Sequence, residues 1–528
     1  MALTLPPEII CSILLELAPF EDDHDTYHQD SHPQITPCVG WLAASQVCRK
    51  WRNTALGFSK LWAENLCAFA SNNLTDCFLE RAKSSLLVFG FGQKLTDHQI
   101  SLAIERLSQV KVLELGRAPL TSLVTALGNC PLSQLQILRL RRWEGAGDSL
   151  VVDLYLKAPV LRELYLDSVL FPVEAPLLRV FCVTARPRRY RDRFDYSSST
   201  GVILAALKGF PLLKALTLRG LHAFAPEDPS VSATQKRAVL ELPHLRRVRL
   251  IDKENDFELY NLLRAAPNAD VGITVGPYTP ANHLPSVFAV MEPHMRVQAY
   301  DTLAVYEEED RNDTLVGIRL RPSASSRLRD DDEGAPEFAL DATICPGPEP
   351  QLSALGIVEL LKPHLDLTKI RYLDLGEIGT EGYVQISPQG LRETLKPFVN
   401  VTTLRINGEL RCAGAHLRAL WADKTEKMVL PALRNLVVHD LTGARKMSLS
   451  GLGEAWADLH RILQERPIDT LALTGSEKYA EDVQSILFTI MDMEMGDGKY
   501  LQEAEGLVKE VVDSRGLSQQ GWEYFAGL

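Results

Sequence analysis

Several features of specialised proteins are absent from this chain of 528 residues. It has no stretch of about 20 consecutive apolar residues, so we expect no membrane-spanning helix. The N-terminus lacks a basic segment and Glu8 interrupts its apolar run, so we expect no secretory signal. Its nine cysteines are scattered and form no C-x-x-C pair. This distribution disfavours a disulfide framework or a zinc finger and favours a reducing compartment, cytoplasmic or nuclear.

The chain also lacks a net positive charge and the common catalytic motifs. The net charge is −12, which argues against general nucleic-acid binding because that binding needs a basic surface. The patterns G-x-S-x-G, H-E-x-x-H, G-K-[ST] and G-x-G-x-x-G do not occur. His24, His28 and His32 are spaced as zinc ligands on a helix would be, but Pro33 follows and the segment is polar. We therefore predict no catalytic residues, no cofactor and no metal.

A short apolar phrase recurs along most of the chain. Its template is L-x-x-L-x-L, with apolar residues at positions one, four and six. Ten copies begin at Val110, Leu135, Leu161, Leu178, Leu213, Leu245, Ile370, Val401, Leu433 and Ile468. Positions four and six alternate as in a half-buried strand, and helix-like stretches lie between the phrases. The pattern predicts an α/β fold, a leucine-rich-repeat solenoid with parallel strands on its concave face and helices outside. A doubly wound α/β domain is the alternative, but it lacks the support of a glycine-rich phosphate loop.

Two short apolar segments precede the repeats. Leu5, Ile9, Ile13 and Leu17 lie four residues apart, on one face of an expected helix. The segment at 41–56 also shows helical spacing of apolar residues, and the bulky pair Leu61-Trp62 follows it. A head of about 65 residues is marginal in size, so we expect it to gain stability from a partner that covers its apolar face.

These segments carry a resemblance to a known family. The phrases L-P-P-E-I at 5–9 and V-C-R-K-W at 47–51, with the closing L-W at 61–62, resemble the F-box. An F-box followed by leucine repeats is similar to fungal F-box leucine-rich-repeat proteins. The chain departs from the pattern in an acidic, histidine-containing insertion at 18–40, which we expect to loop out.

The resemblance implies a function. The head would bind the Skp adaptor and, through it, a cullin, while the repeats capture a protein substrate and the chain performs no chemistry. The implied adaptor contacts are Leu5, Pro6, Ile9, Ile13, Leu17, Val47, Cys48 and Trp51. We expect Leu5, Pro6 and Trp51 to touch the adaptor directly, whereas Leu17, Val47 and Cys48 could instead pack the helical core. A second hypothesis is a scaffold that binds the adaptor or other partners without ligase assembly.

Substrate contacts are expected on the face of the sheet that the leucines leave open. Position five of a phrase and the residue after position six point to that face. The candidates are Arg139, Arg141, Tyr165, Arg219, Arg249, Arg405, Asn407 and His439. The basic run at 186–194 adds Arg188, Arg189 and Arg191, which could grip an acidic or phosphorylated peptide. A solvated loop is the alternative for that run, and we predict neither nucleic acid nor a membrane as a partner.

Four regions are expected along the chain. They are an F-box at 1–65, a linker with a first atypical repeat at 66–109, the solenoid at 110–475 and a helical C-terminal cap at 476–528. Residues 251–369 break the rhythm of the repeats, and we interpret them as about three degenerate repeats with strands at 271–275, 315–321 and 337–344. The acidic runs at 307–310 and 330–333 are expected in solvated loops. A hydrolase or transferase site in this irregular region is a further alternative.

Overall fold

The computed structural model contains two compact units. It describes residues 5–17, 40–90, 95–116, 120–141, 154–184, 197–219, 240–252, 263–264, 269–275, 284–297, 300–310, 313–321, 338–344, 354–377, 387–407, 416–421, 428–439, 449–474 and 498–513. The first unit comprises Met1–Leu245 with Leu262–Ala265, and the second comprises Arg246–Asn261 with Ala266–Leu528. Each unit combines helices with mostly parallel strands, which confirms the predicted α/β class.

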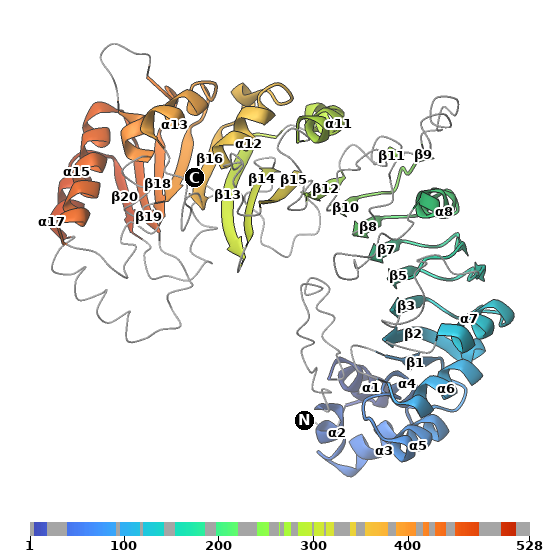
Figure 1. The fold of residues 1–528 in the computed structure, drawn as a ribbon. Coiled ribbons are helices and arrows are strands. Elements are labelled where there is room, and N and C mark those ends of the chain that lie inside the picture. Colours follow the sequence, from blue (N-terminus) through green and yellow to red (C-terminus); the bar gives the residue numbers. More distant parts are fainter. Residues whose placement is uncertain are drawn as a thin grey trace, which may run out of the picture. The chain divides into compact units, whose positions relative to one another are not determined.

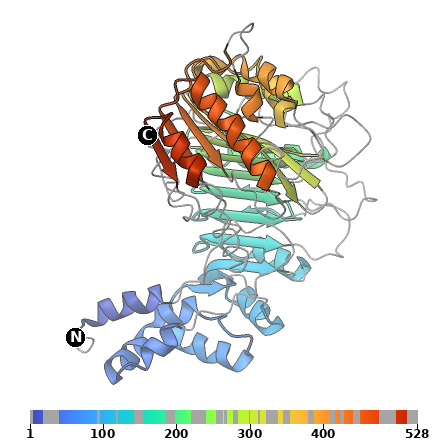
Figure 2. The same ribbon diagram turned by 90° about the vertical axis from the view of Figure 1, so that its left-hand side faces the viewer.

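The first unit begins with a cluster of helices, drawn in blue in Figure 2. These helices are α1 (Pro7–Glu16), α2 (Gly40–Ser45), α3 (Arg49–Gly57), α4 (Ser59–Glu64) and α5 (Asn72–Ala82). The rings of Trp41, Trp62 and Phe78 meet edge to face in their core, with the Trp41 and Trp62 centroids 5.2 Å apart and those of Trp62 and Phe78 4.9 Å apart. Each such pair adds about 0.5–1.5 kcal/mol beyond burial, so the cluster ties α5 firmly to the preceding helices.

A parallel sheet follows in the first unit. Its strands, in spatial order, are β1 (Leu87–Phe89), β2 (Val110–Gly116), β3 (Ile137–Arg141), β5 (Glu163–Asp167), β7 (Val180–Thr184) and β8 (Ala215–Arg219). The helices α6 (Asp97–Glu105), α7 (Leu120–Asn129) and α8 (Ser197–Lys208) all lie on one face of it (Figure 1). The other face is therefore open among the described residues. Two short strand pairs accompany the sheet, β4 (Leu156–Lys157) with β6 (Val173–Glu174) and β9 (Leu240–Glu241) with β11 (Leu263–Arg264).

The repeated phrase explains these strands. In all ten copies the residues at positions one, four and six are buried, with at most 6% of their surface exposed. Leu164 and Leu166 of β5 are typical, at 0% and 1% exposed, while Tyr165 between them points to the open face. Position one, such as Leu161, is buried just before its strand begins. Within each unit the leucines thus stack from strand to strand into an apolar core under the helices.

The second unit contains a longer sheet. Its strands, in spatial order, are β10 (Arg247–Asp252), β12 (Asp270–Val275), β15 (Phe338–Ile344), β14 (Asp313–Arg321), β13 (Thr302–Asp310), β16 (Tyr372–Glu377), β17 (Thr403–Asn407), β18 (Asn435–His439), β19 (Thr470–Thr474) and β20 (Glu510–Asp513). The accompanying helices are α11 (Leu284–Val297), α12 (Ala354–Leu361), α13 (Pro388–Leu395), α15 (Leu449–Glu465) and α17 (Gly498–Glu505), with a short 3₁₀ turn η4 (Leu367–Lys369).

The middle region departs from a simple repeat. The three predicted strands are present as β12, β14 and β15, but β14 runs antiparallel to both β13 and β15. Only two residues separate β13 from β14, and a parallel connection needs a dozen or more, so this link forces a hairpin. The acidic run at 307–310 was expected in a loop, yet it forms the end of β13 and pairs with β14. The run at 330–333 lies outside the described residues.

The C-terminal region also differs from the expectation of a helical cap. It contains the helix α17 and then the strand β20, which pairs in parallel with β19. The sheet therefore gains one more strand. The sequence did not predict this strand, because apolar and polar residues do not alternate in the short segment E-V-V-D. Among the helices in the described ranges, we find none with the length and apolar character required to cross a bilayer.

Candidate functional site

The apolar residues of helix α1 differ in how far they are buried. Ile10 and Leu14 are fully buried against the neighbouring helices. Ile9 and Leu17 are 47% and 37% exposed. Val47, in the turn between α2 and α3, is 59% exposed. The head thus has its own core and still presents large aliphatic side chains to solvent.

The other predicted adaptor contacts lie at different depths. Pro6 is exposed, and Leu5, Ile13 and Cys48 are half-buried. Trp51 is only 7% exposed, so its ring packs within the head instead of offering a contact surface. The exposure of Val47 and Leu17 likewise removes the alternative that these two side chains fill the core.

Hydrogen bonds fix the geometry of the head. The Nζ of Lys50 donates to the carbonyl of Leu5 at 2.6 Å, which joins α3 to the start of α1. The indole of Trp62 donates to the carbonyl of Ala55 at 2.8 Å, and the guanidinium of Arg81 stacks 4.4 Å from the Trp62 ring. Since Arg81 belongs to α5, this stacking holds the helices that carry the exposed aliphatic residues against a helix outside the head.

The predicted substrate contacts of the first unit form cross-strand ion pairs. Arg139 is 8% exposed, with Nη1 3.5 Å from Glu114 and Nη2 4.0 Å from Glu163. Its guanidinium also lies 4.8 Å from the ring of Tyr165. Arg141 pairs with Asp167 on the next strand at 3.2 Å. Arg139, Arg141 and Tyr165 therefore lie together on the open face, and Arg219 ends the strand β8 on the same unit.

The second unit repeats this arrangement. Arg405 pairs with Asp374 of the neighbouring strand at 3.1 Å. His439 lies 3.0 Å from the hydroxyl of Thr474, and burial lowers the pKa of His439 to about 4, with the charge of Arg405 adding to the effect. Asn407 is in register with His439 at the end of β17. The predicted residues described here thus gather on one face of the sheet in each unit, and carboxylates on adjacent strands already engage Arg139, Arg141 and Arg405.

Arg249 shows the closest cross-strand pairing. Both of its terminal nitrogens donate to Asp270, at 3.2 and 3.0 Å. To reach this carboxylate the side chain lies flat over Gly272, where an added Cβ would come within 2.6 Å of the Arg249 Cδ. A side chain at position 272 would displace the guanidinium from its present place.

Some predicted features lie outside the described residues. These are Arg188, Arg189 and Arg191 in the basic run, and the histidines at 24, 28 and 32 within the insertion. In the ranges that the structure does describe, no group of three or more histidine, cysteine or carboxylate side chains is placed to hold a metal ion.

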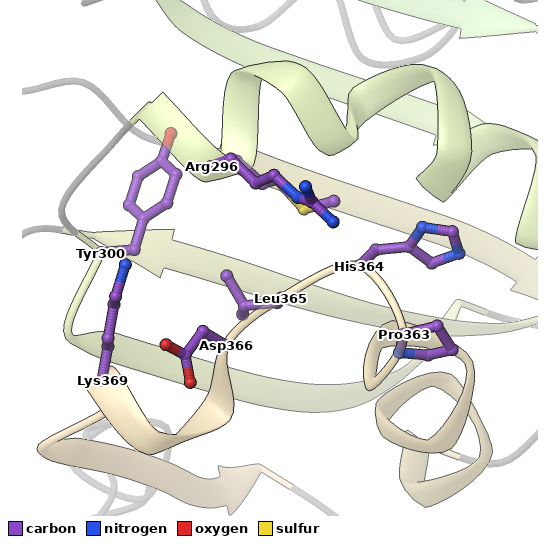
Figure 3. A pocket seen from close by; sticks show the side chains of 8 residues that line it. Arg296, Tyr300, Pro363, His364, Leu365, Asp366 and Lys369 are labelled. Carbon is purple, nitrogen blue, oxygen red and sulfur yellow. The ribbon is translucent and has the colours of Figure 1, made fainter.

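A pocket of about 450 Å³ lies in the second unit, between the end of α11 and the segment that follows α12 (Figure 3). Its lining residues are Met295, Arg296, Tyr300, Pro363, His364, Leu365, Asp366 and Lys369. The Nδ1 of His364 lies 3.0 Å from the Glu292 carboxylate, and Arg296 pairs with the same carboxylate. The lining carries the cations Arg296 and Lys369 and the carboxylate Asp366, and Arg296 is already paired with Glu292, so the charges do not favour one class of ligand.

Sequence reasoning missed two arginines on the open face. Arg319 and Arg321 belong to β14, whose phrase I-R-L-R differs from the repeat template. The signal was nonetheless present, since Ile318 and Leu320 are buried and alternate with the two arginines.

The family comparison supports the assignment of the head. Residues 2–67 match the model of the F-box-like family. This range contains all of α1 to α4, so the chain contains an F-box-like domain, as the sequence predicted. No curated protein matches the chain.

Proposed function

We propose that the chain is a substrate-recognition subunit of an SCF-type cullin–RING ubiquitin ligase. The F-box-like domain binds the Skp adaptor, which connects it to the cullin. The parallel-stranded region, a leucine-rich-repeat solenoid in this proposal, captures a protein substrate, and the chain performs no chemistry itself. The observation that carries the proposal is the aliphatic surface that the F-box-like helices leave uncovered.

The energetics of this surface suit an interface. Single exposed apolar residues are common on any protein. Here Ile9, Leu17 and Val47 are 47%, 37% and 59% exposed and all belong to the segment that matches the F-box-like model. Full burial of such a side chain contributes about 1.5–3 kcal/mol, so covering the remaining surface of each contributes about 1 kcal/mol. Three such side chains on a rigidly packed helical head can form the centre of a docking surface.

Charge substitution at this surface tests the proposal. We expect Ile9→Asp and Val47→Asp each to weaken Skp binding at least tenfold, because a carboxylate would be desolvated in an apolar interface. The measurement is co-purification with the adaptor and the cullin, followed by titration calorimetry with the adaptor. Wild type should retain both partners, and the variants should lose both.

The controls separate binding from folding. Leu74→Asp changes a residue of α5 that is 41% exposed and lies outside the matched range, so it should bind as wild type does. Trp51→Ala removes a buried ring at a cost of about 3–5 kcal/mol, so lost binding there would report unfolding of the head. Circular dichroism must show that the aspartate variants keep their helices. Unimpaired adaptor binding by both folded aspartate variants would contradict the proposed surface.

The same experiment distinguishes the alternative scaffold. A chain that holds the adaptor but never recruits the cullin would be an interaction protein without ligase assembly. If the chain binds neither the adaptor nor the cullin, the F-box-like domain is only a folded helical head of the first unit and has no docking role.

A further inference from the structure

One edge of the sheet in the first unit carries two parallel rows of side chains. It is the edge at which the strands β5, β7 and β8 begin (Figure 1). Each strand is entered through the same turn, in which the amide of position one donates to the carbonyl three residues earlier. These bonds join Leu161 to Ala158, Leu178 to Ala175 and Leu213 to Phe210, at 3.1, 3.0 and 3.2 Å. A proline follows the acceptor in every case, as such a turn favours.

The turns create an apolar row along this edge. The residue after each proline is aliphatic: Val160 is half-buried, Leu177 is 42% exposed and Leu212 is 37% exposed. The three prolines beside them are exposed, namely Pro159, Pro176 and Pro211. Each aliphatic residue lies three positions before the first paired residue of its strand, so the row follows the strand spacing of about 4.8 Å.

A basic row runs beside the apolar row, at position two of the same phrases. It consists of Arg162, Arg179 and Lys214, and all three are exposed. The amide of Arg179 donates to the carbonyl of Arg162, and the amide of Lys214 donates to the carbonyl of Arg179, both at 2.7 Å. The three side chains therefore start from adjacent strands, about 4.8 Å apart. Position one between the two rows is buried, so both rows border the same edge.

The basic row keeps its charge available to a partner. Within the described part of the chain, none of its three side chains forms an ion pair. The carboxylates that adjoin the row in the chain lie elsewhere. Glu163 is on the open face, 4.0 Å from Arg139, and Glu174 of β6 is 3.8 Å from Lys157. No ion pair joins Glu241 of β9 to the row.

The corresponding edge of the second unit differs in charge. Position two on β2, β3, β5, β7 and β8 of the first unit holds no acidic residue; the residues are Lys111, Gln136, Arg162, Arg179 and Lys214. On β13 and β16 to β20 of the second unit, the residues are Asp301, Arg371, Thr402, Arg434, Asp469 and Lys509. Both signs of charge occur there, so the basic row is a property of the first unit and not of the repeated phrase.

We propose that this edge of the first unit binds an amphipathic helix of a partner protein, with acidic residues over the basic row and aliphatic residues over the apolar row. A helix rises about 5.4 Å per turn, so over two strand spacings it departs from the rows by only about 1.2 Å, which long side chains can absorb. In an extended segment, side chains on one side recur about every 6.7 Å and depart by nearly 4 Å, about three times as much. A protein is favoured over nucleic acid because the chain carries a net charge of −12.

The inference goes beyond the proposed function, because it uses neither the F-box-like head nor the open face. The test uses full-length protein and a fluorescein-labelled, alanine-rich helical peptide with Glu-Leu pairs at positions i, i+4 and i+7. We expect fluorescence anisotropy to show binding that weakens with added salt. Replacing the three glutamates with glutamine should lower the affinity at least tenfold. A peptide of the same charge with a central proline, which breaks the helix, should also bind more weakly.

The protein variants complete the test. Arg179→Gln should lower the affinity about tenfold, because it removes a charge-assisted hydrogen bond. Leu177→Ser should lower it about fivefold, because the helix no longer covers an aliphatic side chain there. The matched control is Arg371→Gln, which changes an exposed arginine at the same phrase position in the second unit and should leave binding unchanged. All three positions are exposed, and circular dichroism must show that the variants remain folded.

Several results would overturn the inference. These are no binding of the glutamate peptide by wild type, equal losses in Arg179→Gln and Arg371→Gln, equal binding of the proline peptide, and stronger competition by phosphatidylserine vesicles or single-stranded RNA than by the unlabelled peptide. Adaptor co-purification is measured on the same preparations. Failure of the peptide with a retained adaptor overturns the edge alone, whereas loss of the adaptor with retained peptide binding overturns the ligase function alone.

Discussion

Two histidines, one buried and one half-buried, predict how the second unit responds to acid. His294 of α11 is 9% exposed, and its Nε2 lies 3.2 Å from the Tyr300 hydroxyl. Burial lowers the pKa of His294 from 6.5 to about 4. Burial, followed by the charge of Arg405, lowers the pKa of His439 to a similar value of about 4. Both folded-state values lie below those of the unfolded chain, so acid protonates the unfolded state first and favours unfolding.

The magnitude follows from the two pKa values. The stability is fully present above pH 6.5 and is lost as the pH falls towards about 4. One pKa unit corresponds to about 1.4 kcal/mol, so each histidine can cost at most about 3.4 kcal/mol. At about pH 5 each costs about 2 kcal/mol, so wild type should lose about 4 kcal/mol of unfolding free energy between about pH 8 and pH 5. Carboxylates with lowered pKa values, such as Glu292 and Asp469, lose their pairing at lower pH than this window.

The assay is urea unfolding with peptide-resolved hydrogen exchange, which reports on each unit separately. His294→Gln and His439→Gln keep a hydrogen-bonding group but cannot titrate, so each should remove about half of the pH dependence in the second unit. The double variant should lose nearly all of it. A double variant that still loses about 4 kcal/mol over the same window would refute the reasoning, because the titrating groups would lie elsewhere.

Two further substitutions test the backbone and a buried charge. Gly90→Ala should lower the unfolding free energy of the first unit by about 2–3 kcal/mol, because Gly90 has a φ of +119° and an added Cβ would lie 2.8 Å from a β2 carbonyl oxygen. Gly116→Ala, where an added Cβ has nothing within 4 Å, is its control. Arg466→Met should cost about 2–4 kcal/mol in urea unfolding, because the buried guanidinium donates to two main-chain carbonyls at 2.9 and 3.3 Å. Arg461→Met, with a side chain 49% exposed, should change stability by less than about 0.5 kcal/mol, and equal losses in the two arginine variants would contradict the prediction.

The regular strands could be predicted from sequence because each carries its own signal. Leu164 and Leu166 alternate with polar neighbours, and this local pattern already determines which side chains are buried. The hairpin of β13 and β14 could not be found in this way. The end of β13 is a run of four acidic residues, whose composition favours a loop, and the pairing with β14 overrides that preference.

The face of α1 was ambiguous for a different reason. Its sequence has one apolar stripe through Ile9 and Leu17 and another through Ile10 and Leu14, and both fit a helix. Which stripe is buried depends on the neighbouring helices, because α2, α3 and α4 all pack against α1. The sequence therefore located the F-box-like segment but could not separate its core side chains from those left exposed.

Ion pairing divides the open-face arginines into two groups with different roles. The Arg139 side chain is 9% exposed and has carboxylates on both neighbouring strands, so a partner would have to break existing pairs to reach it. Such a residue contributes mainly to holding β2, β3 and β5 in register. Arg247 has a side chain 51% exposed and shares a single carboxylate with Arg249. A partner that drew Arg139 away would leave its two half-buried carboxylates without their cation. The exposed Arg247 side chain can be contacted without breaking such a pair, so it is the more accessible of the two to an acidic group.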